Sequence, residues 1–313
     1  MRTVMVFQAP TQLYTFLWHI VPYLFEDYDP WTRYYYSVLC CFVLVNGLAN
    51  WFCVILYDPS YAKTKDNPFL EVRNRDQLPD QFVPLIEQQK SKTNGQSVCE
   101  IPSSDGFQWT YCDKCEMYIP PRAHHCKYCK KCMLKRDHHC FMVGNCIGFK
   151  NQRYFVVLAF YASITGLLGG YFTYRYVNQV VWPGMYSWVE LLFPVAIWKS
   201  IFGVFEPLHA LLILHLYLEF AFGVLGTIYF CSQMNMCIYG YTMYEMTEKI
   251  PVKNNNTVSK NMQSVFGQFW ALNFIFPMTL IFKQHGDGCS WDNIKIDYNA
   301  NNKNVPNGGT KQC

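Results

Sequence analysis

Charged side chains are scarce in this chain. Asp, Glu, Lys and Arg make up only 15% of its 313 residues, whereas about a quarter is usual for a soluble domain. The shortage is local, because several stretches of roughly 20 residues carry almost no charge, as helices that cross a bilayer require. This distribution excludes an ordinary soluble globule and a disordered chain. The net charge of +4 is also too small for a basic nucleic-acid surface, so no nucleic-acid partner is expected.

Four apolar stretches are predicted to cross the membrane as helices, at about residues 4–25, 34–57, 154–174 and 208–231. The first lacks the short apolar core and the cleavage site of a signal peptide, so we interpret it as a retained span; a helix lying on the membrane surface is the alternative. The apolar loop 188–205 is broken by Glu190, Pro194 and Lys199. It is predicted to be re-entrant or interfacial rather than a fifth span.

The distribution of basic residues predicts the topology. Twenty-three of the 26 Lys and Arg residues lie in segments that four spans place on one side of the membrane. Because basic loops stay in the cytosol, both chain ends and the segment between the second and third spans are expected there. A fifth span would put the basic C-terminal tail on the opposite side.

These spans divide the chain into four parts. Residues 1–57 are predicted to form a transmembrane hairpin, and residues 58–153 a cytosolic region with a cysteine-rich domain at about 109–153. Residues 154–231 hold the third and fourth spans with the apolar loop on the lumenal side. Residues 232–313 form a cytosolic C-terminal region, whose apolar run 265–282 is expected to dock rather than to cross. The end of the chain, 289–313, is rich in Asn, Gly and Lys and is predicted to be disordered.

Cysteine and histidine crowd into one short segment. Seven of the 15 cysteines and four histidines lie between positions 112 and 146, which indicates metal ligation in a reducing compartment rather than disulfides. Two tetrahedral zinc sites would use eight of these eleven residues. If each site takes three Cys and one His, at least one cysteine is left over. We expect short hairpins and turns folded by the metal; a purely structural zinc module is the alternative.

The cluster ends in Asp137-His138-His139-Cys140. A thiol becomes a nucleophile as its thiolate, which a nearby imidazole can generate and stabilise. A histidine two residues before Cys140 on an extended segment points the same way, and an adjacent carboxylate can orient that histidine. The pattern therefore favours Cys140 as nucleophile, His138 as base and Asp137 as the orienting group.

The spacing Cys-x2-Cys-x9-His-Cys-x2-Cys-x2-Cys-x4-Asp-His-His-Cys-x5-Cys over 112–146 resembles the cysteine-rich domain of the DHHC protein S-acyltransferases, or palmitoyltransferases. The resemblance implies two structural zinc ions. One would be held by Cys112, Cys115, His125 and Cys132, and the other by Cys126, Cys129, His139 and Cys146. It also implies that Cys140 carries the acyl group as a thioester intermediate.

Outside the cluster the resemblance is looser. Asp58-Pro59-Ser60 is similar to the family's Asp-Pro-Gly, and Thr242-Met243-Tyr244-Glu245 to its Thr-Thr-x-Glu. Residues 261–277 are similar to its C-terminal aromatic motif. After Cys140 the family usually has Pro-Trp-x-Asn-Asn-Cys, where this chain has Phe-Met-Val-Gly-Asn-Cys.

The resemblance implies the expected function, which is transfer of a long-chain acyl group from acyl-CoA to cysteines of partner proteins. These cysteines are expected to lie on the cytosolic side, close to the membrane. Three basic residues are candidate contacts of the CoA headgroup, namely Arg122, Lys135 and Arg136. The expected location is an endomembrane, with ER or Golgi favoured and the plasma membrane as the alternative. A zinc adaptor without activity, and a transporter using His209, His215 and Glu219, are the rival hypotheses.

Overall fold

The structure is a computed structural model that describes residues 2–61, 101–102, 108–250, 252–275, 284 and 286–296. The chain forms two compact units. The membrane unit comprises Met1–Cys53, Tyr154–Met234 and Asn273–Pro277, and the cysteine-rich unit comprises Val54–Arg153, Asn235–Leu272 and Met278–Cys313. Each unit is described by itself.

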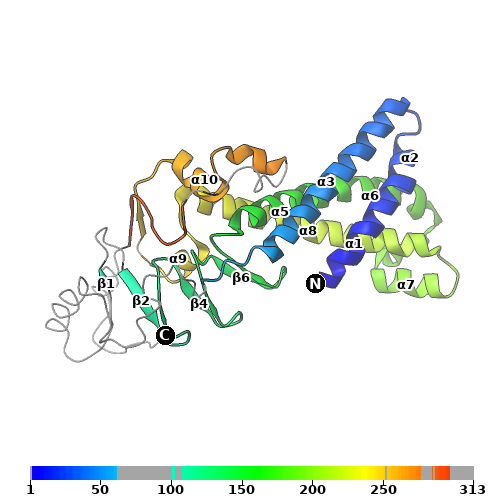
Figure 1. The fold of residues 1–313 in the computed structure, drawn as a ribbon. Coiled ribbons are helices and arrows are strands. Elements are labelled where there is room, and N and C mark those ends of the chain that lie inside the picture. The colour runs from blue at the N-terminus through cyan, green and yellow to red at the C-terminus, as the bar shows by residue number, and fades with distance from the viewer. Residues whose placement is uncertain are drawn as a thin grey trace. The chain divides into compact units, whose positions relative to one another are not determined.

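The long helices carry most of the regular structure (Figure 1). In chain order the first helical segments are α1 (Arg2–Thr15), the π-helix η1 (Phe16–Ile20), α2 (Val21–Leu24) and α3 (Pro30–Leu56). The third apolar stretch forms α5 (Gln152–Ile164), η3 (Thr165–Gly169), α6 (Gly170–Tyr176), η4 (Val177–Val181) and η5 (Trp182–Gly184). Then follow η6 (Trp188–Leu191), α7 (Phe193–Ile201) and α8 (Pro207–Tyr239).

Three of the described helices are long and apolar enough to cross a bilayer: Pro30–Leu56, Gln152–Gly184 and Pro207–Tyr239. They coincide with the second, third and fourth predicted spans. The first predicted span is helical from Arg2 to Leu24 but has Pro10 inside it and π-helical turns at Phe16–Ile20, and it is not one of the three. Helix α7 has nine residues, far fewer than the roughly 20 needed to cross, as expected for the apolar loop.

Small residues let α8 approach the third apolar helix closely. A Cβ on Gly166 would lie 2.2 Å from the backbone nitrogen of Gly223, and one on Gly226 would lie 2.6 Å from that of Ser163. Beside these contacts the Ser163 and Thr227 hydroxyls lie 2.6 Å apart. Close backbone approach and hydrogen bonds between helices are the usual sources of stability inside a bilayer.

Polar side chains join α1 to α8 within the membrane unit. The two ring nitrogens of His215 lie 3.2 Å from the hydroxyls of Thr11 and Thr15. Gln12 donates a 2.8 Å hydrogen bond to Oε1 of Glu219. His215 and Glu219 are both buried, and these partners favour the reading of His215 as a satisfied structural group.

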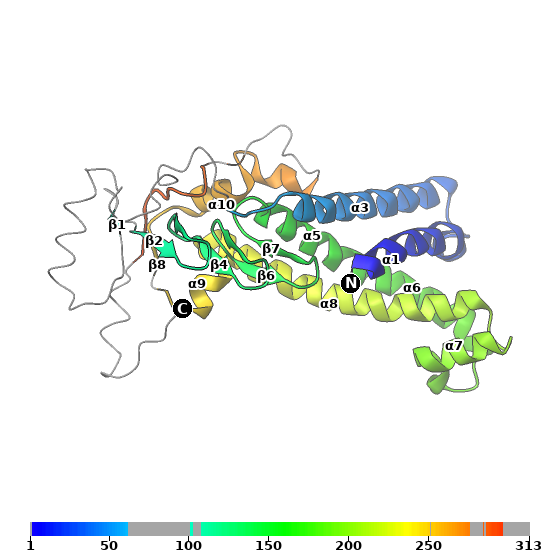
Figure 2. The same ribbon diagram turned by 60° about the horizontal axis from the view of Figure 1, so that its bottom comes forward.

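The cysteine-rich unit consists of short antiparallel hairpins and turns, as the sequence predicted. Its strands are β1 (Ile101–Pro102), β2 (Gln108–Cys112), β3 (Met117–Ile119), β4 (His124–Cys126), β5 (Lys131–Met133), β6 (His138–Cys140) and β7 (Asn145–Ile147). The pairs are β1 with β2, β2 with β3, β4 with β5, and β6 with β7. Figure 2 shows β4, β6 and β7 of this unit close together.

The C-terminal region adds a second layer to this unit. It contains α9 (Met243–Thr247), β8 (Val252–Asn254), α10 (Val258–Phe266) and β9 (Ile294–Ile296), with β8 paired to β9; η7 (Trp270–Phe274) follows α10. The expectation of disorder over 289–313 is wrong for 289–296, because Trp291 and Ile294 are buried in one core with Cys112, Cys132 and Phe149. The remaining residues of that tail, and the part of the apolar run beyond Ile275, lie outside the described residues.

Candidate functional site

A short internal repeat builds the cysteine-rich unit. The four residues of the first predicted zinc set each recur 14 positions later as the second set: Cys112 and Cys126, Cys115 and Cys129, His125 and His139, Cys132 and Cys146. The strands follow the same interval, because β4 and β5 are matched by β6 and β7. This 14-residue interval is visible in the sequence when the spacings of the ligand residues are compared, but a count of ligand types alone does not reveal it.

The structure brings these residues together in two groups of four whose ligand atoms all lie within 4.8 Å of one another. In the first group, Nδ1 of His125 lies 3.2 Å from Sγ of Cys115 and 3.8 Å from Sγ of Cys112. In the second, Nδ1 of His139 lies 3.3 Å from Sγ of Cys129 and 3.6 Å from Sγ of Cys146. A tetrahedral zinc ion with ordinary bond lengths separates its ligands by about 3.5 Å. Both groups therefore suit a zinc ion.

Strand register explains how each group forms. His125 is directly opposite Cys132 in the β4–β5 hairpin, and His139 is directly opposite Cys146 in the β6–β7 hairpin. Side chains of directly opposed residues project to the same face of a hairpin. The Cys-x2-Cys turn of the preceding repeat supplies the other two thiols. Each group is thus shared between consecutive repeats.

The turns that begin at Cys112, Cys126 and Cys140 share one backbone feature. Glu116, Lys130 and Gly144 occupy the same place in successive copies, and all have positive φ, at 50°, 54° and 67°. The amide of Lys130 donates to the carbonyl of Cys126 at 2.8 Å, and that of Gly144 donates to the carbonyl of Cys140 at 2.9 Å. Cys140 therefore begins a third metal-binding type of turn.

The third turn lacks its second thiol. Val143 occupies the position that Cys115 and Cys129 hold in the earlier turns. Among the described residues, Cys140 belongs to neither group of metal-ligand type, and it is 4% exposed. The count of ligands from the sequence left one cysteine over, and the interrupted repeat gives the structural reason.

Asp137 and His138 form a hydrogen-bonded pair beside this thiol. Nδ1 of His138 lies 2.7 Å from Oδ2 of Asp137, whose side chain is fully buried. Burial alone would lower the pKa of His138, but the hydrogen bond to Asp137 and the neighbouring Cys140 sulfur raise it to about 9. The ring is thus expected to be protonated at neutral pH.

The environment of Cys140 favours its thiolate. Burial would raise the pKa of the Cys140 thiol, yet hydrogen bonds from the His138 side chain and the Val143 amide lower it below its ordinary value. The corresponding amides of the second turn, at Cys129 and Tyr128, lower the pKa of Cys126 in the same way. The second turn holds a sulfur that belongs to a group suited to a metal ion, whereas the third turn holds Cys140, which belongs to neither group.

Backbone groups after α8 hold Asp137 from its other side. The amide of Met243 donates a 2.7 Å hydrogen bond to Oδ1 of Asp137. Thr242 caps α9 through a capping box with Glu245, so this amide is held at the helix start. Because a backbone group makes the contact, the change from the family's Thr to Met243 leaves it intact.

The three basic residues predicted for the CoA headgroup differ in their surroundings. Arg122 is 2% exposed and makes two hydrogen bonds, of 2.6 and 2.8 Å, to Glu245. Lys135 is also buried, and burial together with nearby Arg122 lowers the pKa of Lys135 to about 8. Arg136 is half-buried, bonds the carbonyl of His125 and lies over the ring of Tyr244. Arg122 thus pairs with the buried carboxylate of Glu245 and not with an anion at the surface.

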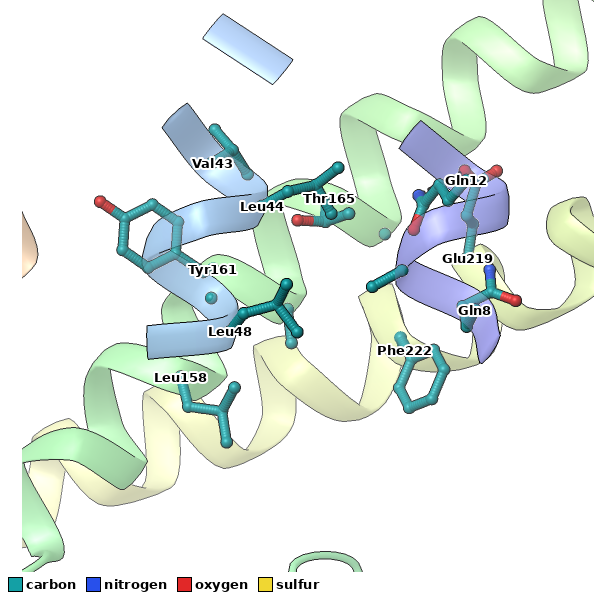
Figure 3. A pocket seen from close by; sticks show the side chains of 14 residues that line it. Gln8, Gln12, Val43, Leu44, Leu48, Leu158, Tyr161, Thr165, Glu219 and Phe222 are labelled. Carbon is teal, nitrogen blue, oxygen red and sulfur yellow. Dashed lines mark hydrogen bonds between the residues drawn. The ribbon is translucent and has the colours of Figure 1, made fainter. Parts of the chain in front are cut away.

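The membrane unit contains an apolar cavity lined by α1, α3, α5, η3 and α8 (Figure 3). It has about 590 Å³ of empty space including its open side. Leu48, Leu158 and Phe222 line its apolar part, and the pair Gln12 and Glu219 lies at one end with Gln8 (Figure 3). The space is thus bounded mostly by apolar side chains.

The region that contains the site is similar to a known protein family. Residues 106–250 match the family model described as DHHC palmitoyltransferase. The chain carries a DHHC palmitoyltransferase domain. The resemblance noted in the sequence is thereby confirmed, and the DHHC domain includes both metal-type groups, Asp137-His138-His139-Cys140 and Thr242–Glu245.

Several curated proteins are similar to the chain. Palmitoyltransferase ZDHHC22 of Rattus norvegicus is 33% identical over 162 residues, which are 51% of this chain and 61% of that protein. Palmitoyltransferase PFA4 of Eremothecium gossypii is 36% identical over 154 residues, 47% of this chain and 36% of that protein. Probable protein S-acyltransferase 13 of Arabidopsis thaliana is 30% identical over 127 residues, 39% of this chain and 36% of that protein. The chain thus spans about three fifths of the rat relative.

Proposed function

We propose that this protein is a protein S-acyltransferase that moves a long-chain acyl group from acyl-CoA to cysteine thiols of membrane-associated proteins. One observation carries the proposal: Cys140 occupies a turn built like those of the metal-type groups but has Val143 in place of a second thiol, and the Asp137–His138 pair lies beside it. The match to the DHHC family model and the names of the relatives support the same activity.

The transfer takes two thioester exchanges. The Cys140 thiolate attacks the thioester carbonyl of acyl-CoA, and the CoA thiolate leaves and takes a proton from the His138 imidazolium. A substrate thiol then attacks the acyl-Cys140 thioester and gives its proton back to His138. One thioester is broken for each one formed, so no ATP is needed, and a ping-pong kinetic pattern follows.

Asp137 and the zinc ions have supporting roles in this proposal. Asp137 fixes the His138 tautomer through Nδ1 and stabilises the charged ring. Zinc held by the two groups of three Cys and one His supplies rigidity, because a module of short hairpins has little core of its own. His139, a ligand in the second group, anchors the strand that carries both His138 and Cys140.

We further propose that the cavity of the membrane unit accepts the acyl chain, since its lining is mostly apolar. Of the three basic candidates for the CoA headgroup, Arg136 is the direct contact, because it is the only one of the three residues that is not fully buried. Lys135 and Arg122 would act through their charge.

The remaining parts of the proposal concern the membrane. Residues 2–24 serve as a fourth span beside the three candidate helices, with both chain ends and the DHHC domain in the cytosol and the α7 loop on the lumenal side. The division into residues 1–57, 58–153, 154–231 and 232–313 follows from that topology. The protein resides in an endomembrane, and its substrates present cytosolic cysteines close to the bilayer.

The decisive experiment incubates the purified full-length protein with palmitoyl-CoA and maps the adduct by mass spectrometry. A hydroxylamine-sensitive palmitoyl group is expected on Cys140, and it should be absent from Cys140→Ser while that variant keeps two zinc ions. Cys231, an exposed cysteine outside the DHHC cysteine cluster, provides the matched control, because Cys231→Ser should label like the parent. An unlabelled Cys140 in zinc-loaded protein would instead favour the zinc adaptor.

A further inference from the structure

The segment from Gly286 to Ile296 packs against the cysteine-rich module although it lies beyond the region that matches the DHHC family model. Strand β9 pairs with β8, and the buried Trp291 shares a core with Cys112, Cys132 and Phe149. Gly288 has φ of +79°, and a Cβ there would lie 2.8 Å from the Phe149 ring. The segment is therefore closely fitted to the module.

Trp291 contacts other residues of the cysteine-rich unit in two ways. Its indole Nε1–H donates to the carbonyl of Pro121 at 3.3 Å. The guanidinium carbon of Arg122 lies 4.7 Å from the centre of the Trp291 ring system, and Nζ of Lys135 lies 5.6 Å from it. A buried cation against an indole ring is a stabilising cation–π arrangement, stronger than its exposed equivalent.

The backbone at Arg122 needs such support. The amide of Ala123 bonds the carbonyl of Pro120 at 3.1 Å, which closes a tight turn. Arg122 is the third residue of that turn and has φ of +65°, a conformation that glycine and asparagine adopt readily and other side chains resist. Contacts of the Arg122 side chain must therefore hold the turn in this form.

Arg122 connects with Asp137 by two routes. Its carbonyl accepts a 3.0 Å hydrogen bond from the amide of Arg136, the residue before Asp137. Its guanidinium bonds Glu245, which accepts from the amide of Thr242 at 2.8 Å, and the next amide, of Met243, donates to Asp137. The first route ends on the backbone beside Asp137, and the second ends on the Asp137 carboxylate, which orients His138.

We propose that Trp291 is a positioning residue for the acyl-transfer reaction, acting through Arg122 on the orientation of Asp137 and His138 toward Cys140. The inference rests on the proposed function. It assigns to a tail segment outside the matched domain a part in setting the rate of the chemical step.

The test compares Trp291→Leu, which keeps an apolar side chain but removes the ring, with Ile294→Ala as matched control. Ile294 is buried in the same core and lies on the same segment. Single-turnover formation of the Cys140 acyl-enzyme is measured in full-length protein carrying two zinc ions. Trp291→Leu is expected to slow this step by roughly tenfold with an unchanged KM for palmitoyl-CoA. Trp291→Phe, which keeps an aromatic face, should recover most of the rate, and Ile294→Ala should only lower thermal stability.

A double variant separates positioning from general loosening. In an Asp137→Ala background, Trp291→Leu should slow the reaction no further, because the group through which Trp291 acts is gone. The inference is overturned if Trp291→Leu and Ile294→Ala slow acyl-enzyme formation equally. It is also overturned if Trp291→Leu slows the reaction as much in the Asp137→Ala background as in the parent. If Trp291→Leu fails to bind two zinc ions, Trp291→Met, which fills more of the ring's volume, takes its place.

Failure of the proposed function has a different signature. If the parent protein forms no acyl adduct on Cys140, the acyltransferase proposal falls, and alkylation of Cys140 by iodoacetamide then serves as the readout. That reaction needs no acyl-CoA, and Trp291→Leu should slow it relative to Ile294→Ala. An acylating parent whose rate Trp291→Leu leaves unchanged refutes the positioning role alone.

Discussion

The tripeptide His-His-Cys occurs twice in the DHHC domain, at 124–126 and at 138–140. Both copies are three-residue strands, each paired with the strand that follows it. In both, the middle histidine belongs to a group suited to a metal ion. The cysteine at the end of the first copy also joins such a group, whereas Cys140 does not. Identical side chains in matching backbones thus differ in their chemistry.

The residues around the two copies account for the difference. Ala123 precedes the first copy and Asp137 the second. Three residues after the cysteine that ends each copy, the first has Cys129 and the second has Val143. His124 lies against the Tyr244 ring, with centroids 4.1 Å apart, and burial lowers the pKa of His124 to about 4. His138, bonded to Asp137, has its pKa raised to about 9. Two substitutions within the repeat therefore separate a structural copy from a reactive one.

The largest expected effect comes from the first copy. Cys126→Ser removes one ligand of the second metal group, and binding of a structural zinc ion provides on the order of 10 kcal/mol of folding free energy. The zinc content should fall from about two to about one ion per chain, and the DHHC domain should lose its protection from protease. Metal analysis and limited proteolysis measure both.

The equivalent cysteine of the second copy is the control. Cys140→Ser should keep its full zinc content and its protease resistance, because Cys140 lies outside both groups. Equal loss of zinc in the two variants would mean that Cys140 is a ligand. The proposed reaction would then lose its nucleophile.

The next largest effect is expected when the residue that precedes the second His-His-Cys copy is changed to match the one that precedes the first copy. Asp137→Ala places an alanine where the first copy has Ala123, and it leaves His138 without the bond to Nδ1. Formation of the acyl-enzyme is expected to slow by roughly 100-fold, the scale on which an oriented acid–base group contributes. Single-turnover acylation with palmitoyl-CoA measures it.

Ala123→Asp is the reciprocal variant. It introduces a carboxylate before His124, but Cys126 remains in its metal group, so no second acylated cysteine should appear. An acyl adduct on Cys126 would show that the leading carboxylate alone confers reactivity. A rate for Asp137→Ala equal to that of the parent would remove Asp137 from the mechanism.

The sequence predicted this site unusually well because its chemistry depends on short, fixed spacings. The ligand types between Cys112 and Cys146 lie close in the chain, so counting them predicted two metal sites with one cysteine left over, and the resemblance to the DHHC family implied which residues form each set. Three of the predicted spans lie almost entirely within the three long apolar helices, since each is a continuous apolar run with at most one charged residue. Local patterns of this kind need no knowledge of tertiary contacts.

Contacts between distant residues were the part that the sequence did not reveal. Arg122 was assigned to the CoA headgroup as an available cation, but its partner Glu245 lies 123 residues away. Trp291 lies in a polar, Asn-rich tail whose composition predicted disorder, and its burial depends on the pairing of β9 with β8. Amino-acid composition averages over the whole tail. It does not reveal that a single residue, Trp291, is buried against residues far away in the chain.

The smallest effect is expected for a substitution at residue 143, where the sequence of the third turn differs from that of the first two. Val143→Cys restores the Cys-x2-Cys spacing in a turn whose backbone already matches, with Gly144 at positive φ like Lys130. Two thiols and the nearby His138 then offer three ligands to a metal ion, short of the four in a complete structural site. Added Zn²⁺ should therefore slow acylation of this variant by roughly tenfold, while the parent is unaffected.

The control for this change is Val143→Ala, which alters packing at the same buried position without adding a ligand. Its acylation rate should not respond to zinc, and that of Val143→Cys should recover when the added zinc is removed by dilution. Zinc-insensitive acylation by Val143→Cys would mean that the missing thiol is not what keeps metal away from Cys140. The identity of residue 143 would then matter less than Asp137 in separating the two copies, and the carboxylate alone would explain why one His-His-Cys reacts.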